Sequence, residues 1–108
     1  MLELWYNANM DAETPLYYIY QDKQRIGWIK NVDKEGYIDS ILIYKEYRNN
    51  GYGKEALIAL KAIEKRVLKL DVKVDNEQAF KCYLAVGFKP CEAWHQSKED
   101  YIGMVWEN

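Results

Sequence analysis

The sequence predicts a single domain of the α/β class, of the α+β type, with a mixed, mostly antiparallel sheet and two main helices. The length of 108 residues suffices for one ordinary domain but not for two. Apolar residues recur at every second position in the first half of the chain, whereas the second half contains two stretches with the period of an amphipathic helix. No repeat or linker interrupts the chain, so we assign residues 1–108 to one domain.

Four β-strands are predicted in the first half, where β-branched and aromatic residues alternate with polar ones. A polar connector, residues 7–15, follows the first strand. Gly27, close behind the polar turn 22–25, marks a β-bulge in the third strand. The aliphatic run 41–43 indicates that the fourth strand is central and buried on both faces. The four predicted strands are residues 2–6, 16–21, 26–31 and 37–44.

A helix that starts near Gly51 is followed by a fifth strand, residues 68–74. A strand that returns through a helical crossover is almost always right-handed, so we expect residues 68–74 to lie parallel to residues 37–44. The helix should bury one apolar stripe. The stripe consists of Ala56, Leu57, Leu60, Ile63 and Val67.

The second helix is predicted between a capping box, formed by Asp75 and Gln78, and a terminal glycine, Gly87. Gly87 fits the left-handed position that ends many helices. After it the chain returns to extended structure, with a loop at residues 92–100 and a last strand at residues 101–106.

Composition and charge exclude several classes of protein. Fifteen Lys and Arg residues against seventeen Asp and Glu residues give a net charge of −2, so we expect no affinity for nucleic acid. No apolar run approaches the roughly 20 residues that span a membrane, and no secretory leader is visible, so we expect a cytoplasmic protein with no membrane partner. The two cysteines lack the paired spacing of a zinc site, and no metal is predicted.

A glycine-containing loop that joins the central strand to the first helix carries the strongest chemical signal. Two glycines let the backbone turn tightly, and the first turn of a helix presents N–H groups without partners at the positive end of its dipole. Such a turn binds anions, and flanking Arg and Lys side chains favour a phosphate or pyrophosphate. The loop comprises Arg48, Asn49, Asn50, Gly51, Tyr52, Gly53 and Lys54.

A dinucleotide fingerprint is an alternative explanation for the same glycines, because Gly51, Gly53 and Ala56 have its spacing and Asp71 lies twenty residues beyond Gly51. In that fold the first glycine closely follows its strand, and the surrounding strands are parallel. Here antiparallel hairpins precede the loop, and about seven residues separate Ile43 from Gly51. The geometry therefore argues against a dinucleotide site.

Two sequence blocks resemble the signatures of the GNAT N-acetyltransferase superfamily. The first is Arg48-x-x-Gly51-x-Gly53 after the strand Ile41-Leu42-Ile43, which is similar to the family's acetyl-CoA motif. The second is Asn76-x-x-Ala79-x-x-x-Tyr83-x-x-x-Gly87-Phe88, which is similar to its C-terminal block. The resemblance covers residues 16–90 and implies a GNAT-like sheet in which the fourth and fifth strands splay apart.

The resemblance also implies that acetyl-CoA is the cosubstrate. Its pantetheine arm would insert between the splayed strands, its pyrophosphate would rest on the amides of the glycine loop, and Asn76 would contact the arm unless it merely caps its helix. The cofactor-binding residues are then Ile41, Leu42, Ile43, Arg48, Asn49, Asn50, Gly51, Tyr52, Gly53, Lys54, Asn76 and Tyr83.

Acetyl transfer from a thioester requires an oxyanion donor and a proton for the leaving thiolate. A backbone N–H near Leu42 or Ile43 can serve as the donor. Tyr83 falls on the family's general-acid position, although its spacing alone fits a core tyrosine. Asp71 occupies a fifth-strand position where some protein-acetylating relatives carry a carboxylate base, and Asp39 could relay a proton through water. Both aspartates are otherwise ordinary exposed strand residues.

We therefore expect transfer of the acetyl group of acetyl-CoA to a primary amine of a small molecule or a protein. The alternative is a module of the same fold that binds CoA or a protein with little or no turnover. Relatives usually place two helices between the first and second strands, whereas residues 7–15 leave no room for them. This reduced acceptor wall predicts an open groove, lost catalysis, or a homodimer in which a partner completes the wall; of these we expect the homodimer.

Overall fold

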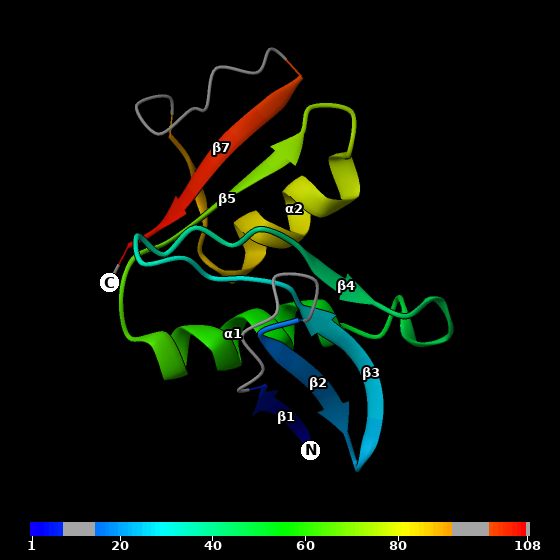
Figure 1. Cartoon of the computed structure of the whole chain (residues 1–108). Coiled ribbons are helices and arrows are strands. Elements are labelled where there is room, and N and C mark those ends of the chain that lie inside the picture. The colour runs from blue at the N-terminus through cyan, green and yellow to red at the C-terminus, as the bar shows by residue number, and fades with distance from the viewer. Residues whose placement is uncertain (8–14, 92–99, 108) are drawn as a thin grey trace.

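The predicted α/β fold class, with two helices and a mostly antiparallel arrangement, is confirmed by the computed structural model, which describes residues 1–7, 15–91 and 100–107 (Figure 1). The predicted connector 7–15 and loop 92–100 lie almost wholly outside the described residues. An antiparallel sheet of four strands runs in the order β1-β2-β3-β4. Its strands are β1 Leu2–Tyr6, β2 Tyr17–Gln21, β3 Gln24–Ile29 and β4 Ile41–Ile43.

A second sheet of three strands has the order β5-β7-β6, and all its pairs are antiparallel. Its strands are β5 Leu68–Lys73, β6 Lys89–Pro90 and β7 Tyr101–Trp106. Helix α1 Tyr52–Glu64 connects the two sheets, whereas α2 Glu77–Val86 joins β5 to β6 within the second sheet. A short 3-10 helix, η1 Lys45–Tyr47, precedes α1. Of the helices described, none is long and apolar enough to cross a membrane.

The turn between β2 and β3 is tighter than predicted. Asp22 and Lys23 both adopt positive φ, 49° and 71°, which is the backbone of a two-residue hairpin turn, so β3 begins at Gln24 rather than at residue 26. The predicted bulge lies beside Gly27, where the register with β2 shifts. Gly27 is required for another reason: a Cβ there would lie 2.0 Å from the carbonyl oxygen of Leu42 on β4.

The prediction of a long fourth strand that runs parallel to the fifth is wrong in two respects: the strand is shorter, and its parallel pairing is less extensive. Only Ile41–Ile43 form β4, and parallel pairing with β5 is confined to one bridge between Tyr37 and Lys69. The N–H of Ile38 donates to Lys69 O, and the N–H of Lys69 donates to Gly36 O, each at 2.8 Å. Beyond this junction the two strands run in diverging directions (Figure 1). The junction is thus the vertex of the predicted splay.

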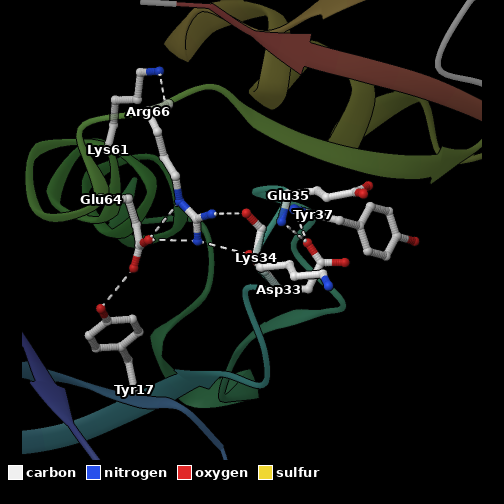
Figure 2. A network of polar contacts seen from close by, with 8 residues as sticks. All are labelled: Tyr17, Asp33, Lys34, Glu35, Tyr37, Lys61, Glu64 and Arg66. Atoms are coloured by element: carbon white, nitrogen blue, oxygen red, sulfur yellow. Dashed lines mark hydrogen bonds and ion pairs between the residues drawn. The ribbon is translucent and has the colours of Figure 1, made fainter.

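Arg66, just before β5, connects this region to the rest of the fold through hydrogen bonds (Figure 2). The two terminal nitrogens of Arg66 donate to the carbonyl oxygens of Lys34 and Asp33, at 2.6 and 2.8 Å. Its Nε donates to Glu64 at 3.0 Å, and the other carboxylate oxygen of Glu64 accepts the hydroxyl of Tyr17 at 3.0 Å. One guanidinium therefore links the end of α1, the loop before β4 and, through Glu64, strand β2.

The core lies between the sheets and the helices, where Ile19, Leu57, Leu60 and Phe88 are fully buried. The buried stripe of α1 ends at Leu60. The predicted core residue Ile63 is 49% exposed, because the last turn of α1 projects beyond the core and contributes Glu64 to the polar contacts of Arg66.

The predicted capping box at Asp75 is also wrong. Asn76 is the N-cap of α2, and its side-chain oxygen accepts the N–H of Ala79 at 3.1 Å. At the other end of α2, the N–H of Gly87 and that of Phe88 donate to the carbonyl oxygen of Tyr83. Gly87 has a φ of 132°, and a Cβ there would lie 2.7 Å from the indole nitrogen of Trp106.

Candidate functional site

A cavity of about 490 Å³ lies between β4, the N-terminal half of α1 and one face of α2. Its volume is within the range of about 300–1,000 Å³ that small-molecule sites occupy. Ten of the twelve residues that the sequence predicts for cofactor binding line it, although they are spread over a span of 43 residues, from Ile41 to Tyr83. These ten are Ile41, Ile43, Arg48, Asn49, Gly51, Tyr52, Gly53, Lys54, Asn76 and Tyr83.

The loop into α1 presents a run of backbone amides without protein partners. The N–H of Arg48 donates to Lys45 O and that of Glu55 to Gly51 O, but the N–H groups of residues 49–54 donate to no other group in the described chain. Asn49 and Gly51 have positive φ, 66° and 78°, which makes successive N–H groups point to one side. We call residues 49–54 the amide cradle; it combines such a nest with the positive end of the α1 dipole.

The backbone of β4 offers hydrogen-bonding groups on its other edge. The N–H of Tyr44 donates to Ile26 O and the N–H of Lys30 donates to Ser40 O, so the even-numbered residues face β3. In an antiparallel pair the intervening residues turn their N–H and C=O groups outward. Ile41 and Ile43 therefore present theirs toward the splay, whereas the backbone of Leu42, a predicted donor, is directed at Trp28 of β3.

Arg48 and Lys54 place positive charge beside the amide cradle. The Nε of Arg48 donates to Ile43 O at 2.8 Å, which holds its guanidinium at the cavity wall. Asn50 does not line the cavity; its side chain donates to the carbonyl oxygens of Tyr47 and Arg48, both at 3.2 Å, and so shapes the loop. The side chains of this loop therefore add charge and rigidity, and the backbone supplies the free donors.

One face of α2 forms the opposite wall. Asn76 at its N-terminus uses Oδ1 to cap the helix, which leaves its Nδ2 as a donor toward the cavity. Gln78 donates to the side-chain oxygen of Asn49 at 3.4 Å and so links α2 to the amide cradle. The two predicted roles of Asn76, helix cap and ligand contact, are compatible because they use different atoms.

Tyr83 lies on the same face of α2, about two turns after Asn76. Its ring packs edge-on against Phe88 with centroids 5.9 Å apart. Burial raises the pKa of Tyr83, and the neighbouring Cys82 adds to this, so the phenol is protonated at neutral pH. Its hydroxyl has no hydrogen-bond partner among the residues that the structure describes. Tyr83 thus combines a packed ring with a proton donor at the cavity wall.

The two predicted carboxylates lie outside the cavity wall. Asp71 on β5 accepts the hydroxyl of Tyr37 at 3.1 Å, and its other oxygen is buried without a partner in the described chain. Burial, followed by the charge of Asp71, raises the pKa of Tyr37 to about 12. Asp39 is exposed, and its N–H donates to Asn31 O. The structure therefore does not bring either aspartate to the same wall as Tyr83.

Five further residues line the cavity without having been predicted to bind ligand. Helix periodicity alone could have found three of them, because Leu57 lies one turn after Gly53, and Ala79 and Cys82 lie on the face between Asn76 and Tyr83. Tyr47 and Gln78 depend on how the loop folds, which no spacing reveals. The five are Tyr47, Leu57, Gln78, Ala79 and Cys82.

Known structures share this fold. PaiA N-acetyltransferase from Thermoplasma acidophilum, in complex with coenzyme A, superposes with a TM-score of 0.69 at 21% identity, over 85% of this chain and 59% of that chain. A GNAT family acetyltransferase from Elizabethkingia anophelis with acetyl-CoA bound gives a TM-score of 0.68 at 16% identity, over 100% of this chain and 97% of that chain. At these identities the likeness concerns the fold.

Sequence comparison leads to the same family. A curated relative, the uncharacterized N-acetyltransferase YycN of Bacillus subtilis, is 31% identical over 91 residues, which is 71% of this chain and 58% of YycN. The chain therefore spans less than two thirds of the length of this relative. The family model described as acetyltransferase (GNAT) family matches residues 1–88, and the chain belongs to that family.

Proposed function

We propose that the protein binds acetyl-CoA in this cavity and transfers the acetyl group to a primary amine. The observation that carries the proposal is the amide cradle, whose N–H groups lack acceptors within the described part of the chain and which borders a cavity flanked by Arg48 and Lys54. Unpaired amides at a helix N-terminus bind anions, and the flanking Arg48 and Lys54 suit a phosphate or pyrophosphate. Structures with the same fold bind coenzyme A or acetyl-CoA, which supports this assignment.

The remaining walls of the cavity fit the amide-containing arm of acetyl-CoA. The outward N–H groups of Ile41 and Ile43 and the C=O of Ile41 can pair with an amide-containing arm as a neighbouring strand would, while the C=O of Ile43 accepts Arg48. The Nδ2 of Asn76 faces the same space from α2. Charged donors at one end and paired backbone groups along β4 would hold a long, flexible thioester in one orientation.

The transfer itself needs few side chains. The nitrogen of an uncharged amine attacks the carbonyl carbon of the thioester, a C–N bond forms, and the C–S bond breaks with its electron pair on sulfur. An outward N–H of β4 would stabilise the oxyanion, and the phenol of Tyr83 would give its proton to the thiolate. The proton released by the amine would leave through water, because Asp71 and Asp39 lie outside the cavity wall and Asp71 is already hydrogen-bonded to Tyr37.

Calorimetry with coenzyme A, together with thiol release measured over a panel of primary amines, tests the proposal. Gly51→Glu should abolish binding, because it places a carboxylate in the amide cradle; Gly51→Ala is the matched control, since it carries the same strain at a φ of 78° without the charge. Retained affinity in Gly51→Glu would refute the site. Binding of coenzyme A without turnover on any amine would favour the alternative, a binding module without catalysis.

A further inference from the structure

The face of the four-stranded sheet that points away from α1 is unusually rich in aromatic side chains. The strand register places Trp5 beside Tyr18, Tyr18 beside Trp28, and Trp28 beside Leu42 in one row across all four strands. The neighbouring row contains Glu3 beside Tyr20 and Tyr20 beside Arg25. We call these two rows the aromatic face; its members are Glu3, Trp5, Tyr18, Tyr20, Arg25, Trp28 and Leu42.

The opposite face of this sheet already supplies the core. Ile19, Ile29 and Tyr17 are buried there, and α1 packs against β1 and β4. An antiparallel sheet with one buried face normally carries polar residues on the other. Here no helix or strand in residues 1–7, 15–91 and 100–107 covers the aromatic face, and the indole of Trp5 is 52% exposed. Tyr18, Tyr20 and Trp28 are partly exposed. Trp and Tyr side chains that reach the surface beside an Arg are typical of protein interfaces.

The two charges on the aromatic face lie at opposite ends of one row, separated by Tyr20. The guanidinium carbon of Arg25 sits 3.9 Å from the ring centroid of Tyr18, and its nitrogens donate to the hydroxyl of Tyr20 at 3.3 Å. These contacts hold the guanidinium flat against the sheet. In the described part of the chain Arg25 has no carboxylate partner and Glu3 forms no ion pair.

We propose that a second copy of this chain covers the aromatic face, in a dimer whose two-fold axis lies in the interface and runs along β2. This axis exchanges the positions of β1 and β3, so Glu3 meets the partner's Arg25 and Trp5 meets the partner's Trp28. Tyr18 and Tyr20, on the axis, meet their own copies. The charges are thus self-complementary, as a two-fold interface requires.

Two sheets stacked in this way would form a sandwich about 10 Å thick, with their strands roughly aligned. The proposal is independent of acetyl transfer, because it concerns the face that points away from the cavity-lining helix α1. The aromatic face comprises seven residues, fewer than the roughly 20–30 residues per partner of a standard stable interface. We therefore expect a dimer that dissociates in the micromolar range.

Sedimentation velocity of the 108-residue chain, over roughly 1–200 µM, measures this equilibrium. Glu3→Arg places an arginine against the partner's Arg25, and Arg25→Glu places two glutamates together, so each should raise the dimer Kd by about tenfold or more. An equimolar mixture of the two variants should restore association, because each mixed pair regains opposite charges. Circular dichroism and thermal melting check that each variant is folded.

Glu55→Arg, a charge reversal at an exposed site on α1, is the matched control and should leave the dimer unchanged. Rescue in the mixture supports the proposal, because no effect on folding of the separate chains can produce it. A chain that remains monomeric across the range would overturn it. A dimer that both charge reversals leave intact would also overturn it, and would indicate pairing through the edge of β1 instead.

Discussion

The Oδ1 of Asn76 accepts a hydrogen bond from the N–H of Ala79 at 3.1 Å and thereby caps α2. The same side chain lines the cavity. Its two polar atoms consequently serve different purposes, one toward the helix and one toward the proposed ligand, and substitutions can separate them.

Asn76→Asp should preserve the cap and lose the donor. Asp and Asn cap helices equally well, so we expect an unchanged free energy of unfolding, whereas the carboxylate cannot donate to a ligand and should weaken coenzyme A binding by about tenfold or more. Asn76→Ala loses both functions and should cost about 1 kcal/mol of stability as well. Urea titration and calorimetry on the two variants separate the effects. Equal affinity in Asn76→Asp and the unchanged protein would leave Asn76 with capping alone.

Gly53 is a glycine that the folded chain itself does not require. It has no positive φ, and a Cβ there would meet only Ile43 Cγ1, at 3.9 Å. Gly53→Ala should therefore stabilise α1, by up to about 1 kcal/mol. If the glycine instead lets a ligand approach the amide cradle, the same variant should bind coenzyme A more weakly, by roughly tenfold. Thermal melting without ligand and calorimetry with it measure both. Unchanged affinity would exclude Gly53 from the contact surface.

Tyr83→Phe should affect turnover and little else. The hydroxyl has no partner within the described residues, so its loss should change the free energy of unfolding by less than about 1 kcal/mol and leave the Kd for coenzyme A nearly constant. If the phenol protonates the departing thiolate, kcat should fall by about 100-fold. Steady-state thiol release with a saturating amine checks this. An unchanged kcat would assign Tyr83 to packing against Phe88.

Much of the fold could be predicted because short-range patterns encode it. The alternation in Leu2, Leu4 and Tyr6, the apolar stripe from Ala56 to Leu60 and the glycine at position 87 each describe local structure, and each appears where expected. The length of the fourth strand could not be predicted in this way. The residues before Ile41 alternate like a strand, but in the structure they form only isolated bridges, Val32 with Ile38 and Tyr37 with Lys69, and pairing with distant segments has no local signal.

The same distinction between local patterns and long-range contacts applies to the candidate site. Residues of the loop and of α2 can be predicted as candidates because one local motif contains each group, and the structure brings those groups to one cavity. The roles of individual atoms were not visible. Whether Leu42 or its neighbours face outward depends on pairing with β3, and the bond between Asp71 and Tyr37 joins residues that are 34 positions apart. Neither the pairing with β3 nor the hydrogen bond between Asp71 and Tyr37 can be predicted from residue spacing or composition.

The stability of the fold at alkaline pH should depend on Tyr17. Burial, reinforced by the hydrogen bond to Glu64, raises the pKa of its phenol to about 12, against about 10 in an unfolded chain. A raised pKa stabilises the folded state fully below pH 10, and this contribution disappears as the pH rises from about 10 to 12, because the unfolded phenol ionises first. Tyr17→Phe should lose about 1 kcal/mol at pH 8 through the missing hydrogen bond. Above about pH 10 the unchanged protein loses the stabilisation that comes from the raised pKa of Tyr17, whereas the variant has no phenol there and loses nothing. The difference in free energy of unfolding between the two proteins should therefore become smaller. Urea titrations of both proteins at several pH values measure this difference, and a gap that stays constant up to about pH 11.5 would contradict the raised pKa.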